Sequence, residues 1–161
     1  MAKKPKQAVN EPTIENRRAR YDYVIHETLE CGIKLTGTEV KSVRAGQVSL
    51  AEGYVRASEN PLSLKLHSVH IAEYPPAGEH RQHAPTRTRT LLAQKREIRK
   101  LVDKTREKGT TLVPLKIYFL RGRAKLLVGL GTGKGHVDKR QDIAKRDAKR
   151  EIDRAMSKAR R

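Results

Sequence analysis

Residues 113–130, VPLKIYFLRGRAKLLVGL, hold two runs in which apolar residues stand at every second position. Such alternation is typical of β-strands with one buried face. Between the runs lies Arg121-Gly122-Arg123, where glycine can supply the positive φ of a tight turn. The alternating apolar positions are Val113, Leu115, Ile117 and Phe119, then Leu126, Val128 and Leu130. The stretch therefore predicts a β-hairpin.

The residues before this hairpin add further strand signals separated by turns. Strands are expected at 21–25, 29–35, 54–55, 62–66 and 69–71. A short helix is expected at 39–44 with Thr38 as its cap, and a basic amphipathic helix is expected between Leu91 and Thr105. About six strands favour a mainly β fold, an OB-like antiparallel barrel with flanking helices. The pattern alone does not distinguish such a barrel from a β-sandwich.

Charge divides the chain into two halves. Residues 21–80 carry 5 Lys/Arg against 8 Asp/Glu, whereas the whole chain has a net charge of +18. A surface polarised in this way favours a polyanionic partner on its basic side. Nucleic acid is the first candidate and an anionic membrane surface is the second. Because only six of the 161 residues are aromatic, structured RNA read through phosphates and 2′-hydroxyls is favoured over single strands held by base stacking.

No set of residues points to catalysis or to a bound metal. Cys31 is the chain's single cysteine, which excludes an internal disulfide and a thiolate zinc site. The pairs His67/His70 and His80/His83 lack acidic or thiol partners in the sequence, and we expect His80 and His83 to face solvent. The sequence predicts a non-catalytic, metal-free and cofactor-free protein. With neither a signal peptide nor an apolar run of about 18 residues, it is expected in the cytosol.

The glycine-rich run Gly129-Leu-Gly-Thr-Gly-Lys-Gly135 matches neither nucleotide-binding spacing. A Walker A loop would need glycine where Val128 stands, and Ser or Thr after Lys134. We interpret the run as a flexible joint after the last strand.

The last 28 residues form a basic tail with one narrow apolar stripe. Residues 134–161 carry 11 Lys/Arg against 5 Asp/Glu, and Ala144, Ala148, Ile152 and Met156 recur every fourth residue. That spacing predicts a helix, but the stripe is too small to fold alone. We therefore divide the chain into a flexible leader (1–15), an RNA-binding barrel (16–133) and a tail (134–161) that is disordered when free and helical on a partner.

Four segments of the sequence form a specific set of motifs: Asn16-Arg17-Arg18-Ala19-Arg20, ECGIKLTGTEVKS at 30–42, PTRTRTLL at 85–92, and Gly133-Lys134 with Asp138-Lys139-Arg140. Together they resemble the SmpB family, the tmRNA-binding proteins of bacterial trans-translation. The resemblance implies an OB-fold barrel that binds the tRNA-like domain of tmRNA and brings alanyl-tmRNA to stalled ribosomes. It also implies a monomer without enzymatic activity, which meets elongation factor Tu only through alanyl-tmRNA.

The resemblance assigns roles to two groups of residues. The RNA-binding group is Asn16, Arg17, Arg18, Arg20, Glu30, Arg87, Arg89, Leu92, Lys95, Gly133 and Lys134. The tail group, expected in the decoding region and the empty mRNA channel, is Asp138, Lys139, Arg140, Ile143, Lys145, Arg146, Lys149, Arg150, Ile152, Arg154 and Met156. Four positions differ from the family pattern: Tyr21, Ala84, Thr90 and Val137. Thr90 replaces a usual lysine, which weakens phosphate attraction slightly.

Two other functions share parts of this pattern. A structural ribosomal component would explain the charge equally well and would be stoichiometric on translating ribosomes. An RNA-processing enzyme would need a catalytic set, which the sequence does not nominate. Membrane binding by the tail is disfavoured because its stripe lacks the Trp, Phe or Leu side chains that insert into lipid.

Overall fold

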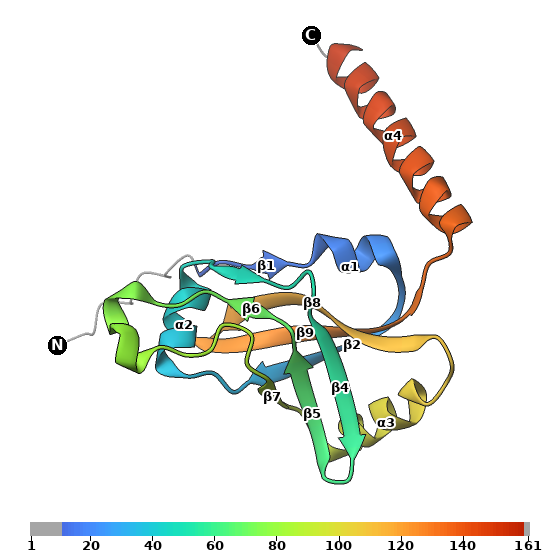
Figure 1. The fold of residues 1–161 in the computed structure, drawn as a ribbon. Helices are drawn as coiled ribbons and strands as arrows, with labels where there is room; N and C mark the ends of the chain where they lie inside the picture. The colour runs from blue at the N-terminus through green and yellow to red at the C-terminus, as the bar shows by residue number, and fades with distance from the viewer. Residues whose placement is uncertain (1–10, 160–161) are drawn as a thin grey trace, which may run out of the picture.

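The computed structural model describes residues 11–159, which form an antiparallel β-barrel with helices around it (Figure 1). The strands are β1 (Ile14–Glu15), β2 (Tyr23–Ile33), β3 (Val48–Ser49), β4 (Tyr54–Glu59), β5 (Leu62–His67), β6 (His70–Ile71), β7 (Arg89–Leu92), β8 (Thr110–Leu120) and β9 (Arg123–Gly133). The α-helices are α1 (Arg17–Asp22), α2 (Gly37–Arg44), α3 (Lys95–Thr105) and α4 (His136–Ala159). Two 3₁₀ turns, η1 (Pro75–Ala77) and η2 (Glu79–Arg81), lie in the loop before β7.

The sheet closes on itself. Its strand order is β1-β8-β4-β5-β7-β2-β9, and β9 also pairs with β8. Closure removes the free edges that a sandwich would leave. The mainly β, OB-like barrel with flanking helices is thereby confirmed, and the alternative of a sandwich is excluded.

The β8–β9 hairpin forms as the alternation predicts, with one change of face. Its strands pair from Thr110↔Thr132 to Leu120↔Arg123, and the turn places Arg121 and Gly122 at φ 51° and 74°. The register shifts between Pro114 and Lys116. Such a bulge reverses which residues face inward.

The bulge in β8 corrects the predicted inward set. Leu112 and Ile117 lie in the main core, although five positions separate them. Val113 and Leu115 instead pack with Ala19 in a second cluster beneath α1. One strand therefore serves two hydrophobic cores.

The N-terminal part of the barrel departs from the expected elements. Residues 23–33 form one strand rather than two, with a register shift between Ile25 and Glu27. Tyr21 belongs to α1, a helix that the alternation concealed. Part of the expected leader belongs to the sheet, because Ile14 pairs with Ile117. Residues 1–10 of that leader lie outside the described residues.

The two predicted helices form with shifted starts. α2 begins after Thr36 rather than Thr38, and the Thr36 amide donates to Glu39 at 2.8 Å in a capping box. Leu91 and Leu92 belong to strand β7, and α3 begins only at Lys95. The spacing of these two leucines continues the apolar spacing of α3, so the start of the helix was predicted four residues too early.

Most of the glycine run, Gly129 to Gly133, belongs to strand β9, and only Lys134 and Gly135 connect that strand to α4. A Cβ on Gly131 would lie 2.5 Å from the Val24 carbonyl oxygen, and one on Gly129 would lie 2.9 Å from Leu115 Cδ1. These glycines let β2 and β8 approach β9 closely.

Candidate nucleic-acid interface

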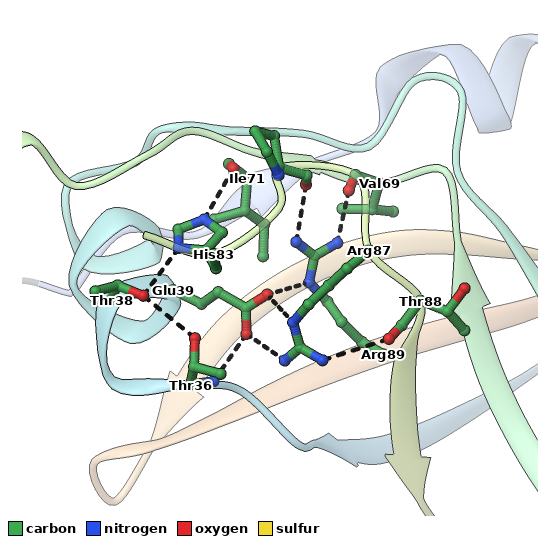
Figure 2. Close-up of polar contacts among 10 residues, drawn as sticks. Thr36, Thr38, Glu39, Val69, Ile71, His83, Arg87, Thr88 and Arg89 are labelled. Atoms are coloured by element: carbon green, nitrogen blue, oxygen red, sulfur yellow. Dashed lines mark hydrogen bonds and ion pairs between the residues drawn. The ribbon is translucent and has the colours of Figure 1, made fainter. Parts of the chain in front are cut away.

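A buried ion cluster fixes the loop that leads into β7 (Figure 2). The Glu39 carboxylate accepts hydrogen bonds from Arg87 Nε and Nη2 at 2.8 and 2.6 Å, and from Arg89 Nε at 2.8 Å. Burial would raise the pKa of Glu39, but the hydrogen bonds from Arg87, the Thr36 amide and Arg89 outweigh it and hold the pKa at about 2. Glu39 is therefore a carboxylate that two arginines share.

Arg89 departs from the expected RNA-binding group. Its side chain is fully buried, and besides Glu39 it donates to the carbonyl oxygens of Val69 at 2.7 Å and Pro85 at 2.9 Å. All of its nitrogens are thus engaged inside the protein. Arg87 is one-third exposed, so part of its guanidinium faces solvent while it holds Glu39.

His83 extends the same cluster and corrects a second expectation. The ring is buried rather than solvent-exposed, with Nδ1 2.9 Å from Thr38 Oγ1 and Nε2 3.1 Å from the Ile71 carbonyl oxygen. His80 is exposed, as expected. His83 therefore has a structural role inside the protein, whereas His80 faces solvent.

Asn16 also has a structural place. Its side chain is buried, with Nδ2 donating to the carbonyl oxygens of Leu50 and Pro114, both at 3.0 Å. Its Oδ1 accepts from the Ala19 amide at 3.1 Å and so caps α1. With its donor and acceptor both used, Asn16 positions the arginines of α1 instead of presenting itself to a partner.

The outer surface of the barrel presents a row of four residues across four strands. Tyr118 on β8 pairs with Lys125 on β9, Lys125 pairs with Gly32 on β2, and Gly32 pairs with Leu92 on β7. Leu92 is 58% exposed. A Cβ on Gly32 would lie 3.3 Å from Leu92 Cβ, so glycine leaves room for that leucine. We call these four residues the platform.

Glu30 lies two residues before Gly32, on the same face as the platform. Its carboxylate accepts a hydrogen bond from the Tyr118 hydroxyl and pairs with Lys125 Nζ at 3.2 Å. These two contacts lower the pKa of Glu30, Tyr118 first. Burial, followed by this hydrogen bond, raises the pKa of Tyr118 to about 12. At neutral pH the platform edge is a fixed carboxylate acceptor beside an apolar surface.

Basic side chains stand on both sides of the platform. Beyond Leu92, α3 carries exposed Lys95, Arg96 and Arg99, none of which forms an ion pair within residues 11–159. On the other side, Arg121 and Arg123 line a hollow with Lys125. The platform therefore lies between two groups of cations, an arrangement suited to a phosphate backbone.

α1 and the start of α4 are joined by polar contacts. Arg17 and Arg20 are exposed, whereas Arg18 pairs with Asp22 at 3.3 Å and Glu52 at 2.7 Å. Lys134 is only 13% exposed, because its Nζ donates to the Arg20 carbonyl oxygen at 2.9 Å and to Asp142 at 2.6 Å. Gly133 is exposed at the end of β9.

Lys139 also contacts α1. Its Nζ lies 2.8 Å from Asp22 Oδ1 and 5.3 Å from the centre of the Tyr21 ring. The hydrogen bond from Lys139 lowers the pKa of Asp22. Tyr21, one of the four positions that differ from the family pattern, is thus a neighbour of the first turn of α4. The other three positions, Ala84, Thr90 and Val137, are exposed.

The tail is the 24-residue helix α4, which leaves the barrel beside α1 and extends away from it (Figure 1). The four-residue stripe predicted a tail that is helical on a partner and disordered when free; the structure has the helix without a partner, and the disorder of the free tail stays a prediction. Every residue from Ile143 to Lys158 is exposed, including Ile152 at 59% and Met156 at 57%. The stripe therefore has no partner within residues 11–159.

The tail group includes Asp138, Arg140 and the cations of the exposed segment. Asp138 and Arg140 are exposed in the first turns. The other exposed members are Ile143, Lys145, Arg146, Lys149, Arg150, Ile152, Arg154 and Met156.

No helix in the described part of the chain is long and apolar enough to cross a membrane.

The sequence model described as "SmpB protein" matches residues 13–158. The chain belongs to the SmpB family. A protein named SsrA-binding protein from Thermobifida fusca is 52% identical over 163 residues, which cover 99% of this chain and 100% of the relative. One of the same name from Roseiflexus castenholzii is 50% identical, covering 88% of this chain and 89% of the relative.

A solved structure agrees with this assignment to the SmpB family. It is described as "tmRNA-SmpB: a journey to the center of the bacterial ribosome". Its matching chain is 50% identical and covers 78% of this chain and 86% of its own length, with a TM-score of 0.65. The match supports both the fold and the family.

Several residues that build the interface were missing from the sequence-based group. Tyr118 and Lys125 orient Glu30, and the hairpin alternation places both in neighbouring strands without revealing their common row. Glu39 and Asp22 were unassigned because Arg87 and Arg89, which hold Glu39, and Lys139, which holds Asp22, lie 48 to 117 positions away. Among residues 11–159, no group of three or more His, Cys, Asp or Glu residues is arranged to hold a metal ion.

Proposed function

We propose that this chain is a non-catalytic tmRNA-binding protein that delivers alanyl-tmRNA to stalled bacterial ribosomes. The barrel binds the tRNA-like domain, and α4 enters the decoding region and the empty mRNA channel. The chain acts as a cytosolic monomer, and elongation factor Tu joins only through alanyl-tmRNA. The observation that carries the proposal is a 24-residue basic helix, exposed from Ile143 to Lys158, that extends from a barrel of the SmpB family.

The platform is the part of the barrel that meets RNA. Exposed Leu92 packs against an unstacked base, and Glu30 accepts hydrogen bonds from 2′-hydroxyls or base edges. Lys95, Arg96 and Arg99 on one side, with Arg121 and Arg123 on the other, contact phosphates. A fixed carboxylate repels phosphate, so Glu30 contributes to selectivity more than to affinity.

The tail acts on the ribosome. Asp138, Lys139 and Arg140 contact the decoding region, and the rest of α4 lies along the mRNA channel. The exposed apolar pair Ile152 and Met156 supports this docking, because sixteen consecutive exposed residues leave the stripe free for a surface outside the chain. Lys139 would exchange Asp22 for ribosomal RNA.

Competition binding tests the barrel's part of the proposal. The chain is expected to bind tmRNA much more tightly than ordinary tRNA, with an affinity that falls steeply as salt rises because phosphate contacts release counterions. Leu92→Ala should weaken tmRNA binding about 10-fold through lost apolar contact. Val24→Ala is the matched control. Val24 is 41% exposed and lies near the start of β2, whereas the platform residue Gly32 lies near its end. Equal affinity for tmRNA and tRNA would refute the proposal.

A further inference from the structure

The outward face of the β4–β5 hairpin carries side chains that the barrel's own packing does not use. The strands pair Tyr54↔His67, Val55↔Leu66, Arg56↔Lys65, Ala57↔Leu64 and Ser58↔Ser63. Val55, Leu64 and Leu66 are buried in the core. The alternate positions therefore point outward, and they contain two aromatic rings, two cations and two serines but no acidic residue.

Tyr54 and His67 form a flat aromatic pair with one exposed ring. Their ring centres are 5.0 Å apart and their planes are within 10° of parallel, while Tyr54 is 47% exposed and His67 is half-buried. His67 Nδ1 lies 3.2 Å from Thr88 Oγ1, which fixes the imidazole against the tyrosine. Burial, with the nearby charges of Arg56 and Lys65, lowers the pKa of His67. This shift favours the neutral imidazole beside the Tyr54 ring.

Cations flank this pair. Arg56 and Lys65 are exposed cross-strand neighbours, two residues or about 7 Å along the strands from the rings. Neither forms an ion pair with any residue in the 11–159 range. The two acidic groups nearest along the chain are both held by other arginines, Glu52 by Arg18 at 2.7 Å and Glu59 by Arg106 at 2.6 Å. The face therefore offers positive charge beside the rings.

Cross-strand aromatic contacts also stabilise sheets, so stacking alone does not identify a site. The other four tyrosines are engaged inside the protein: Tyr118 by Glu30, Tyr74 by Lys41, Tyr21 by Lys139, and Tyr23 by the second hydrophobic cluster. Tyr54 instead stacks on a second flat ring and keeps half its surface in solvent. Aromatic rings with free cations beside them are the arrangement that holds unpaired nucleotides.

We propose that this face binds an unpaired nucleotide of the RNA that the barrel carries. The base stacks on the Tyr54–His67 pair, and its flanking phosphates contact Arg56 and Lys65. Strand β7 links this face to the platform, because Thr90 pairs with Lys65 and Leu92 lies two residues further on. The identity of the RNA as tmRNA rests on the proposed function, whereas the stacking site rests on the hairpin itself.

A single-tryptophan variant tests the stacking directly. The chain has no tryptophan, so Tyr54→Trp places a fluorescent stacking ring at the site without removing its aromatic character. Titration of the full chain with tmRNA should quench and shift this fluorescence at the same concentrations as binding measured independently. Tyr74→Trp is the control, since Tyr74 lies in the loop before β7 over Lys41 and should change little.

Two further variants measure what the face contributes. Tyr54→Leu with His67→Leu should weaken tmRNA binding at least about 5-fold, the lower range for loss of one stacked base. Arg56→Gln with Lys65→Gln keeps the exposed hairpin intact and should reduce the slope of log K against log salt by about 1 to 2. Thermal unfolding of each variant identifies any loss due to misfolding.

The outcomes separate this inference from the proposed function. Binding of tmRNA with Tyr54→Trp fluorescence unchanged, and affinity and salt slope unaffected by both double variants, would overturn the stacking site and leave the proposed function standing. A protein partner on this face would give that same result. Failure of the unaltered chain to bind tmRNA would overturn both.

Discussion

Glu39→Gln removes the negative charge that Arg87 and Arg89 share, and Arg89 then keeps a buried cation without its partner. Both the Glu39 and Arg89 side chains are 0% exposed. Breaking a buried ion pair by removing one partner typically costs about 3–5 kcal/mol. The lowered pKa of Glu39, about 2 against its ordinary 4.5, corresponds to about 3 kcal/mol. We expect the free energy of unfolding to fall by this amount and the Tm by roughly 6–20 °C.

Urea unfolding followed by circular dichroism measures the loss. Glu52→Gln is the matched control, because Glu52 is 75% exposed and its pair with Arg18 should contribute less than about 1 kcal/mol. The pH dependence supplies a second test. Because the folded pKa of Glu39 is depressed, its stabilisation is complete above pH 4.5 and is lost as the pH falls towards 2.

The stability difference between the unaltered chain and Glu39→Gln should therefore shrink across that pH interval. A loss below about 1 kcal/mol at neutral pH would show that the cluster does not hold the β7 loop in place.

Three further changes test other parts of the structure. Gly131→Ala should destabilise the fold by at least about 2 kcal/mol in the same unfolding assay, since its Cβ would lie 2.5 Å from the Val24 carbonyl oxygen. Gly37→Ala is the control and should be nearly neutral, because a Cβ on Gly37 would meet nothing within 4 Å. Cys31 should resist a thiol reagent at pH 8 until the chain unfolds, because burial raises its pKa to about 12; rapid labelling of the folded chain would contradict its burial. Ile152→Asp with Met156→Asp should leave thermal unfolding of the barrel unchanged but abolish tagging on stalled ribosomes, since both side chains are exposed on α4; normal tagging would refute docking through the stripe.

The barrel was predictable because the alternation of apolar and polar residues along its strands can be read from a single sequence. The β8–β9 and β4–β5 hairpins form where apolar residues alternate around turns. The bulge after Pro114 was not predictable, because it depends on how β8 is shared between two cores. Leu92 was assigned to a helix because its spacing fits the α3 stripe, and only pairing with Gly32 makes it a strand residue.

The charged residues show a second limit. Arg89 resembles a phosphate ligand in sequence, yet it is buried because Glu39, 50 positions away, neutralises it. Asn16 is likewise polar and caps a helix inside the protein. Charge in a sequence gives the sign of the surface potential, but burial and long-range pairing decide which cations reach that surface. Lys95 and the cations of α4 do reach it.

Truncation before Asp138 tests most directly whether barrel and tail have separate roles. The barrel core lies within residues 14–133. The pairs lost with α4, Lys134 to Asp142 and Lys139 to Asp22, are partly exposed contacts that contribute little to stability. A chain ending at Val137 should keep selective tmRNA binding and lose peptide tagging on ribosomes stalled at the end of an mRNA. Loss of both activities, or retention of both, would contradict the division between an RNA-binding barrel and a ribosome-binding helix.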